Sequence, residues 1–266
     1  MSQNDMIKCK KSGVTNIEKR KAFPMRDYKI ETEQRVEFIK NVLENAHSKG
    51  IVFGNSGGKD CALVGILCKM ACDNTLGIIM PCGSKQNYGS DKTDAEIFAE
   101  QFDIDTKIVD LSKAREDIIE SLNDFTINDA SLANIAPRLR MTTLYTIAGS
   151  ENRLVAGTGN RSEIYMGYFT KWGDGAYDFD PIADLTVTEV YEFLRYLNAP
   201  ASIIDKAPSA GLFDGQTDEK EMGVTYKSID EYILTGETDS QSKEIIDRYH
   251  RNSEHKRKMP LVYSSK

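Results

Sequence analysis

A glycine-rich loop is the clearest chemical feature of this sequence. The segment between the apolar residues 51–53 and a stretch of helical periodicity reads Gly54-Asn55-Ser56-Gly57-Gly58-Lys59-Asp60. Glycines allow a sharp turn in which several backbone N–H groups face one point, and the start of the following helix adds positive charge. The loop is therefore predicted to bind a phosphate or pyrophosphate group.

Two side chains of this loop suit a nucleotide. The Ser56 hydroxyl can donate to a phosphate oxygen, and the Asp60 carboxylate suits Mg²⁺, which prefers one or two carboxylates beside phosphates. The spacing matches neither the Walker pattern nor the dinucleotide fingerprint, which disfavours both of those classes. From spacing alone, an ordinary glycine-rich turn with Asp60 near a helix start remains the alternative.

Short apolar runs alternate with helical patterns around this loop. Strands are predicted at 51–53, 75–80, 106–109 and 153–156. Helices are predicted at 33–46, with Gly50 as the stop signal, and at 60–71, 91–101, 112–122, 132–148 and 186–197. Such alternation predicts an α/β fold, a doubly wound open parallel sheet with helices on both faces, in which ligands bind beyond the carboxyl ends of the strands.

Composition predicts one globular domain in the cytoplasm. The 266 residues, 40% of them hydrophobic, are enough for one sizeable core. We predict a weakly packed arm at 1–25, which is rich in lysine and poor in apolar residues, and a single domain at 26–266. The formal net charge of −7 disfavours a nucleic-acid partner. No apolar run approaches the about 20 residues of a membrane span, and the start lacks the core of a secretory signal.

The cysteines fit a reducing compartment. Their number is odd, and the chain is much longer than disulfide-stapled scaffolds: Cys9, Cys61, Cys68, Cys72 and Cys82. Three of them could share one helix face and hold a metal. Buried packing is the favoured interpretation, because no Cys-x-x-Cys pair or nearby histidine completes a site.

The phosphate loop resembles the Ser-Gly-Gly-x-Asp-Ser loop of the N-type ATP pyrophosphatases, which typically cleave ATP to AMP and pyrophosphate. With the segments described next, the resemblance extends to the ammonia-dependent NAD synthetases from about residue 30 onward. It implies an adenine nucleotide alpha-hydrolase-like fold. It also implies ATP-dependent amidation of nicotinic acid adenine dinucleotide (deamido-NAD) with ammonia, which yields NAD, AMP and pyrophosphate through an acyl adenylate and is the final step of NAD biosynthesis.

The first further segment reads Asn134-Ile135-Ala136-Pro137-Arg138-Leu139-Arg140-Met141. It resembles the family's Asn-Ile-x-x-Arg-x-Arg-Met segment, which crosses the dimer interface and contributes to the dinucleotide site. The resemblance implies a homodimer in which Arg138 and Arg140 bind deamido-NAD, and guanidinium groups suit this role because they pair bidentately with phosphate oxygens. Alone, the segment would be interpreted as a helix with two solvated arginines.

The second segment runs from Val155 to Glu163 and resembles the family's Gly-Thr-x-x-x-x-Glu. By that match Thr158 contacts ATP, and Glu163 joins Asp60 as the second carboxylate for Mg²⁺. One ion between these carboxylates and the phosphates would neutralise charge as pyrophosphate leaves.

The third segment, Gly167 to Gly175, is similar to the family's Gly-Phe-x-Thr-Lys-x-Gly-Asp-Gly, which receives the nicotinate end of the dinucleotide. The match implies a deamido-NAD site formed by Phe169, Lys171, Trp172, Asp174 and Asp178. An aromatic side chain there can stack on the pyridine ring. Asp60, Lys171 and Asp174 are the predicted catalytic residues, with Asp174 as the proton acceptor for ammonia. A glycine-rich surface hairpin is the alternative.

The fourth segment, Pro208 to Leu212, and the acidic residues after it resemble a family segment and lid loop. Ser209 would contact an ATP phosphate, and Asp218 and Glu219 would belong to the lid. Near the end, His255 and Lys256 match a motif that approaches the dinucleotide and would bind deamido-NAD. The ATP site implied by all these matches comprises Ser56, Gly57, Gly58, Lys59, Asp60, Cys61, Thr158 and Ser209.

The chain departs from the family pattern at three places. Cys61 stands where the family usually has a serine, and a thiol is a weaker donor to phosphate. Val187 stands where relatives often carry a lysine that touches the ATP phosphates, so Lys59 or Lys171 would have to supply that charge. Ala136 and Pro137 stand where lysine and alanine are common.

Two other functions share parts of this pattern. A tRNA-modifying ATP pyrophosphatase would have the same loop but needs an RNA-binding surface, which the acidic composition disfavours. A nucleotide-binding regulatory protein without catalysis is favoured only by Cys61 and Val187. Free ammonia is the expected nitrogen source, because no cysteine has the partner residues of a glutaminase nucleophile.

Overall fold

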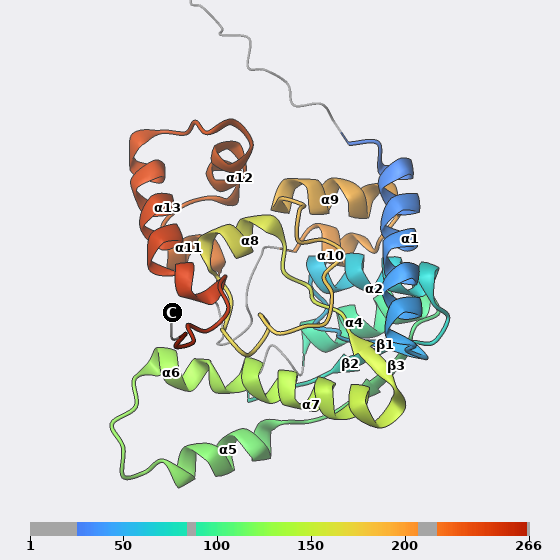
Figure 1. The fold of residues 1–266 in the computed structure, drawn as a ribbon, viewed down its shortest axis with the longest axis horizontal. Coiled ribbons are helices and arrows are strands. Elements are labelled where there is room, and N and C mark those ends of the chain that lie inside the picture. Colours follow the sequence, from blue (N-terminus) through green and yellow to red (C-terminus); the bar gives the residue numbers. More distant parts are fainter. Residues whose placement is uncertain (1–25, 84–88, 207–216, 265–266) are drawn as a thin grey trace, which may run out of the picture.

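A sheet of four parallel strands lies within the fold in the order β3-β2-β1-β4 (Figure 1). The computed structural model describes residues 26–83, 89–206 and 217–264. The strands are β1 Gly50–Gly54, β2 Thr75–Ile79, β3 Asp105–Ile108 and β4 Arg153–Val155. In the register, Ile51 of β1 pairs with Thr75 of β2 and with Leu154 of β4. The predicted parallel sheet is confirmed, and each strand lies where the sequence placed it.

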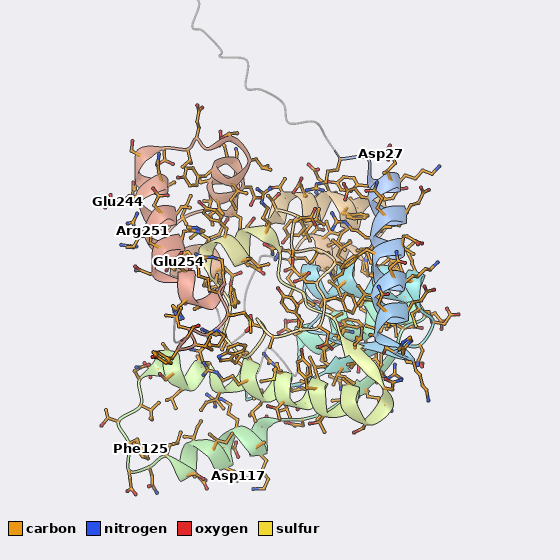
Figure 2. The ribbon with its side chains drawn as sticks, viewed as in Figure 1. Asp27, Asp117, Phe125, Glu244, Arg251 and Glu254 are labelled. Atoms are coloured by element: carbon orange, nitrogen blue, oxygen red, sulfur yellow. The ribbon has the colours of Figure 1, made fainter. Side chains whose placement is uncertain are left out.

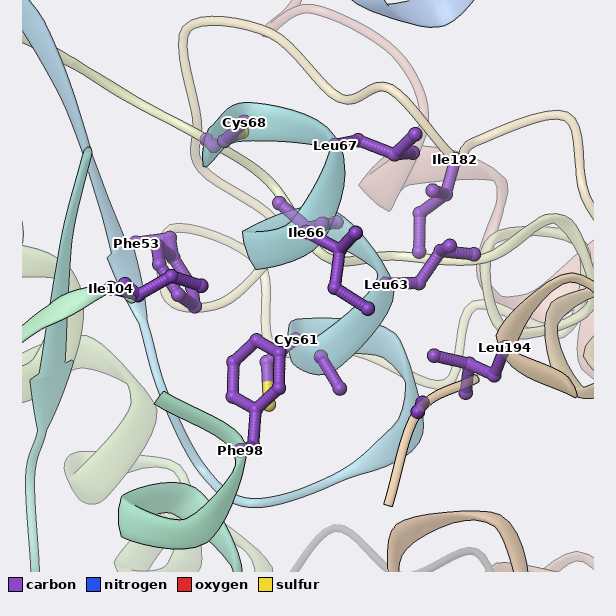
Figure 3. Close-up of a cluster of buried hydrophobic side chains, with 14 of the residues drawn as sticks. Phe53, Cys61, Leu63, Ile66, Leu67, Cys68, Phe98, Ile104, Ile182 and Leu194 are labelled. Carbon is purple, nitrogen blue, oxygen red and sulfur yellow. The ribbon is translucent and has the colours of Figure 1, made fainter. Parts of the chain in front are cut away.

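One face of the sheet is covered by α1 (Tyr28–Ala46), α2 (Lys59–Ala71), α4 (Ser90–Gln101) and α9 (Val187–Tyr196). Alternate residues of a strand point to opposite faces, and β1 turns Ile51 and Phe53 to this side. They join a buried cluster that includes Leu63, Leu67 and Phe98 (Figure 3). This cluster holds α2, and therefore the loop before it, against the sheet.

The opposite face is covered by α7 (Ile135–Glu151), with α5 (Ser112–Ser121) beside it. Val52 of β1 points to this side and packs in a second cluster with Leu144 and Ala148 of α7. Helices therefore cover both faces, which confirms the doubly wound prediction.

The first helix begins earlier than predicted, and its stop signal is not the predicted one. It begins at Tyr28 and not at Glu33, because the Asp27 side chain accepts the N–H groups of Lys29 and Ile30 and caps it. It ends at Ala46, with His47 in the left-handed region. Gly50 is not its stop signal but the first residue of β1, where an added Cβ would lie 2.5 Å from the Asn74 carbonyl oxygen.

The single helix predicted at 132–148 is wrong, because two helices occupy this stretch. They are α6 (Asp129–Ala133) and α7, and Asn134 lies between them. Pro137 falls in the first turn of α7, where the N–H that proline lacks would have no helical partner. The helix runs to Glu151 and ends at Asn152, which has a left-handed φ of 53°.

Several helices of the carboxyl-terminal part were not predicted. They are α8 Arg161–Met166, α10 Ala201–Ile204, α11 Asp218–Met222, α12 Tyr226–Thr235 and α13 Ser240–Asn252, followed by the 3₁₀ turn Glu254–Lys256. A third buried cluster, with Met166, Ile229 and Ile246 among its members, joins α8, α12 and α13. The helices α8, α11, α12 and α13 lie on one side of the molecule, whereas α10 lies beside α9 and α2 (Figure 1).

The predicted arm at 1–25 lies outside the described residues, and the single domain at 26–266 stays a prediction. Among the described helices, none is both long and apolar enough to cross a membrane.

Candidate active site

A cavity of about 1020 Å³ opens at the carboxyl ends of β1, β2 and β4. The loop after β1, the turn after β4, the first half of α7 and residues 166–176 form most of its wall, and α11 and α13 complete it. A volume at the upper end of the usual range for ligand sites suits a large ligand or two adjoining ones. The location at the strand ends is the one predicted from the alternating pattern.

The loop after β1 is held tightly against α4. Gly57 has a φ of 71°, and an added Cβ would lie 2.3 Å from the Asp91 carbonyl oxygen, so only glycine fits. The buried Asn55 side chain donates to the Ala95 carbonyl oxygen at 3.1 Å and accepts the Gly57 N–H at 3.3 Å. This fixed loop leads directly into α2. The N-cap residue of α2 is Gly58, so no side chain at that position caps the first N–H groups of the helix. Phosphate oxygens are the ligands that such a helix start binds.

Two carboxylates meet at the cavity wall with a lysine between them. The Lys59 Nζ lies 2.6 Å from the Asp60 Oδ2 and 3.5 Å from the Glu163 Oε1. Asn160, the cap of α8, donates to the Asp60 Oδ1 at 3.1 Å and accepts the Glu163 N–H at 3.0 Å. The structure therefore brings Asp60 and Glu163 together around Lys59, and α8, which lies far along the chain, positions Glu163. Their role as a pair of metal ligands stays a prediction.

Burial and neighbouring charges shift the pKa values of Glu163 and Lys59. Burial, followed by the charge of Asp60, raises the pKa of Glu163 well above the usual range of a glutamate. Burial alone would lower the pKa of Lys59, but the charges of Asp60 and Glu163 outweigh it and raise that pKa. Lys59 is thus a permanent cation at neutral pH.

The pair fits Mg²⁺ only in company with phosphate. In the parts of the chain that the structure describes, no group of three or more histidine, cysteine, aspartate or glutamate side chains could hold an ion. Mg²⁺ is commonly bound by one or two carboxylates plus substrate phosphates, and Asp60 and Glu163 match that donor set beside the phosphate loop.

The turn after β4 is anchored by an aspartate that the sequence analysis did not single out. The Asp180 carboxylate accepts the N–H groups of Gly159 at 3.0 Å and Ile182 at 2.9 Å. Burial raises the pKa of Asp180 to about 7. Because Thr158 lines the cavity next to Gly159, Asp180 positions this predicted ATP contact.

The far wall of the cavity carries the predicted nicotinate residues Phe169 and Asp174. Lys256 Nζ donates to the carbonyl oxygens of Gly167 at 2.8 Å and Phe169 at 2.7 Å, and lies 5.4 Å from the Phe169 ring centroid. Asp174 Oδ1 accepts the Thr170 N–H at 3.0 Å. Asp174 is exposed to the cavity that it lines. Desolvation by the surrounding protein raises the pKa of its carboxyl. Arg140 lines the same wall and donates to the Met80 carbonyl oxygen at 3.2 Å.

Other predicted residues lie beside the cavity and do not line it. Arg138 donates to the Lys171 carbonyl oxygen at 3.3 Å, and Lys171 Nζ donates to the His255 carbonyl oxygen at 2.7 Å and lies over the half-exposed Trp172 ring. Asp178 accepts the Val155 N–H at 2.8 Å at the edge of β4. Their roles in substrate binding stay predictions.

The structure describes only part of the predicted lid. Ser209 lies outside the described residues. Asp218 is not exposed as in an open loop: it is 3% exposed on α11, lines the cavity and accepts the Tyr226 hydroxyl at 3.0 Å. Glu219 accepts the Tyr226 N–H at 2.7 Å.

An ion cluster at the cavity edge was missed from sequence. Lys206 Nζ lies 2.8 Å from both the Asp91 Oδ1 and the Asp94 Oδ2, and joins the end of α10 to the start of α4. Two acids three residues apart at a helix start were the available signal, but nothing near Lys206 in sequence pointed to them.

Comparison with known proteins decides the family. The profile described as NAD synthase matches residues 31–264. The NH3-dependent NAD+ synthetase of Carboxydothermus hydrogenoformans is 47% identical over 240 residues, which cover 89% of this chain and 98% of that protein. The chain belongs to the NAD synthase family.

Solved structures of the family agree in fold. The NMN synthetase of Francisella tularensis matches with a TM-score of 0.86 and 38% identity over 90% of this chain and 100% of that one. The NH3-dependent NAD synthetase of Campylobacter jejuni matches with a TM-score of 0.73 and 31% identity over 90% and 100% of the two chains. In both comparisons the match extends over the whole of the relative's chain.

At position 187, where relatives often carry a lysine, this chain has a buried valine. Val187 is 3% exposed and packs in the third cluster with Met166, while its N–H donates to the Ser162 hydroxyl at 3.2 Å. Of the two candidate substitutes, Lys59 lines the cavity and Lys171 points to a carbonyl outside it.

The cysteines that the structure describes are free thiols, of which Cys61, Cys68 and Cys82 are buried and Cys72 is partly buried. This supports the packing interpretation.

Replacing Cys61 with serine is expected to keep or raise kcat/KM for ATP, because a hydroxyl is the stronger donor to phosphate. The Cys61 Sγ donates to the Gly58 carbonyl oxygen at 3.1 Å, a contact that a hydroxyl can also make. Steady-state rates at varied ATP measure the effect. Cys68→Ser, a buried thiol on the same helix away from the cavity, is the matched control. A large loss in Cys61→Ser alone would give the thiol a role of its own.

Proposed function

We propose that this chain uses ATP to amidate deamido-NAD with ammonia, and so forms NAD, AMP and pyrophosphate. The observation that carries the proposal is a single cavity that joins three features. The phosphate loop lies at one end, the Asp60–Glu163 pair beside it, and Phe169 with Asp174 on the far wall. The first two suit a triphosphate, and the third suits a pyridine carboxylate.

Activation is required because a carboxylate repels a nucleophile and lacks a good leaving group. Attack of the nicotinate oxygen on the α-phosphorus of ATP gives an acyl adenylate and releases pyrophosphate. The loop N–H groups from Ser56 to Asp60 hold and orient the triphosphate for this attack. Mg²⁺ held by Asp60 and Glu163 would neutralise phosphate charge when bound.

Ammonia then attacks the acyl carbon, AMP leaves, and the surplus proton needs an acceptor. Asp174 is the proposed acceptor, because it faces the cavity and desolvation raises its pKa, which makes its carboxylate a better base. Phe169 supplies a flat surface for the pyridine ring, and Lys256 fixes that surface through the Phe169 carbonyl oxygen.

A second acceptor is favoured by one comparison. The TM-score is higher against a protein named NMN synthetase than against the NAD synthetase from Campylobacter jejuni, at 0.86 and 0.73. Amidation that yields NMN uses the same carboxylate on a mononucleotide. The loop, the carboxylate pair and the adenylation step would be unchanged, so only the space beyond the ribose phosphate distinguishes the two acceptors.

One experiment tests the activity and the choice of acceptor. Purified protein receives ATP, Mg²⁺, ammonium and equal amounts of deamido-NAD and nicotinate mononucleotide, and chromatography separates NAD, NMN, AMP and ADP. We expect NAD as the main pyridine product with an equal amount of AMP. If NMN is the sole amide formed, nicotinate mononucleotide and not deamido-NAD is the acceptor. If the protein binds ATP but forms no amide, the regulatory interpretation is favoured.

We also propose a homodimer, in which a second copy covers α5 and α6. Neither helix has a buried residue, and Phe125 in the loop between them is 67% exposed on the outer side of the molecule (Figure 2). Arg138 at the start of α7 is exposed beside them. A partner packed here would complete the surface next to the nicotinate wall.

The chain is expected to sediment as a dimer at the concentrations used for assays. Phe125→Asp places a charge in the proposed interface and should shift the equilibrium towards monomer, with a lower rate at low protein concentration. Phe38→Asp, at an exposed phenylalanine of α1, is the matched control. A fully active monomer in sedimentation velocity would contradict the homodimer.

The reducing cytoplasm is the proposed compartment. The free thiols of the described cysteines support it.

A further inference from the structure

The side chain of Lys59, between Gly58 and Asp60 of the phosphate loop, is buried in the site. It is 7% exposed and extends between the two carboxylates that are proposed to bind Mg²⁺. Its ammonium also lies 5.7 Å from the Tyr226 ring centroid, which adds a second favourable contact for a cation. The side chain is therefore built into the site and does not extend into solvent.

The position of this ammonium has a direct consequence for divalent cations. An ion bound to both Asp60 and Glu163 has to lie between them, and the Lys59 Nζ already lies there. Like charges at such short range repel strongly, and this repulsion is large in a buried site. A free divalent ion would have to displace the ammonium before it could bind.

The carboxylates need a cation even without nucleotide. Asp218, which is 3% exposed, lines the same cavity as a third acid. Leaving buried carboxylates without a counter-charge is costly. Lys59 supplies the counter-charge. Because its ammonium is part of the chain, it stays beside the carboxylates when no ion is bound.

We propose that Lys59 is a built-in counter-ion that keeps free divalent cations away from Asp60 and Glu163, so that Mg²⁺ joins this site only together with the phosphates of ATP. The proposal rests on the ATP role proposed above. The phosphates supply the further oxygen ligands that Mg²⁺ needs and offer the ammonium a new partner. Lys59 then provides the charge that Val187 does not.

The test measures Mn²⁺ binding to the nucleotide-free protein by electron paramagnetic resonance of the free ion. The wild type is expected to bind Mn²⁺ weakly, whereas Lys59→Met, which keeps most of the length of the side chain and removes its charge, should bind at least about tenfold more tightly. Lys69→Met is the matched control, because Lys69 lies on the same helix and its ion-pair partner in the described part of the chain is the exposed Asp103. It should bind Mn²⁺ as the wild type does.

A second measurement assigns the gain to the carboxylate pair. Adding Glu163→Gln to Lys59→Met should abolish the tighter Mn²⁺ binding, and Mn²⁺ should raise the melting temperature of Lys59→Met more than that of the wild type. Equal Mn²⁺ affinity of wild type and Lys59→Met would overturn the proposal.

The outcome does not depend on catalysis. If Lys59→Met does not fold, the wild type decides: Mn²⁺ binding as tight without nucleotide as with a non-hydrolysable ATP analogue, and lost in Glu163→Gln, overturns the proposal. Weak binding without the analogue and tight binding with it supports the proposal. A protein that binds Mn²⁺ in this way but forms no NAD would contradict the proposed function alone.

Discussion

Replacing Asp60 with asparagine, or Glu163 with glutamine, is expected to lower kcat/KM for ATP by roughly 100-fold or more, the usual loss when one group that faces transition-state charge is removed. Both residues line the cavity, and neither belongs to an apolar cluster. The substitutes keep size and hydrogen-bonding capacity, so Asn160 retains its contacts. Rates at varied ATP and Mg²⁺ measure the effect.

Two substitutions of the same chemical kind serve as controls. Asp103→Asn changes a fully exposed carboxylate, and Glu96→Gln changes a half-exposed one on α4. Both should leave the rate unchanged, and all four variants should melt within about 4 °C of the wild type. Near-normal turnover in Asp60→Asn or Glu163→Gln would remove that residue from the magnesium site.

Glutamine is expected to replace ammonia so poorly that its rate lies within the contribution of contaminating ammonium. A glutaminase uses a reactive thiolate with a base beside it. Among the described cysteines, Cys61 is the one that lines the cavity, and burial raises the pKa of its thiol, which opposes the thiolate. Its hydrogen-bond partners are the Ser56 hydroxyl, the Asn55 Oδ1 and the Gly58 carbonyl oxygen, and none of them is a base.

The measurement compares NAD formation from glutamine, freed of ammonium by an enzymatic trap, with formation from ammonium chloride. At fixed total ammonium the rate should rise with pH, because the neutral fraction that attacks the adenylate grows. Cys61→Ser should leave the comparison unchanged. Comparable turnover with trapped glutamine would refute ammonia as the sole nitrogen source and imply a site for glutamine hydrolysis.

The sheet could be predicted because its signals are local. β1 and β2 are buried almost throughout and read as short apolar runs, the pattern of strands covered on both faces. The helices α12 and α13 gave weaker signals. Within α13, Ile246 is the only buried residue, because this helix packs at the surface against α8 and α12. The break at Asn134 was missed because helical periodicity continues on both sides of it.

The site could be predicted only as far as strand ends bring residues together. The loop after β1 and the turn after β4 leave neighbouring strands, so Asp60, Thr158 and Glu163 line one cavity. The place of the Lys59 ammonium depends on α8, whose Glu163 is 104 residues away in sequence. The same holds for Lys206 and Asp91, which are 115 residues apart. Spacing in sequence carries no information about such contacts.

Transfer of a labelled oxygen tests carboxylate adenylation in this cavity most directly. Deamido-NAD with ¹⁸O in its nicotinate carboxylate is converted with ATP and ammonium, and mass spectrometry measures the label in each product. Attack of the carboxylate on the α-phosphorus predicts one ¹⁸O in AMP for each NAD formed and none in pyrophosphate. Formation of NAD with unlabelled AMP, or with ADP and labelled inorganic phosphate, would contradict activation as an acyl adenylate.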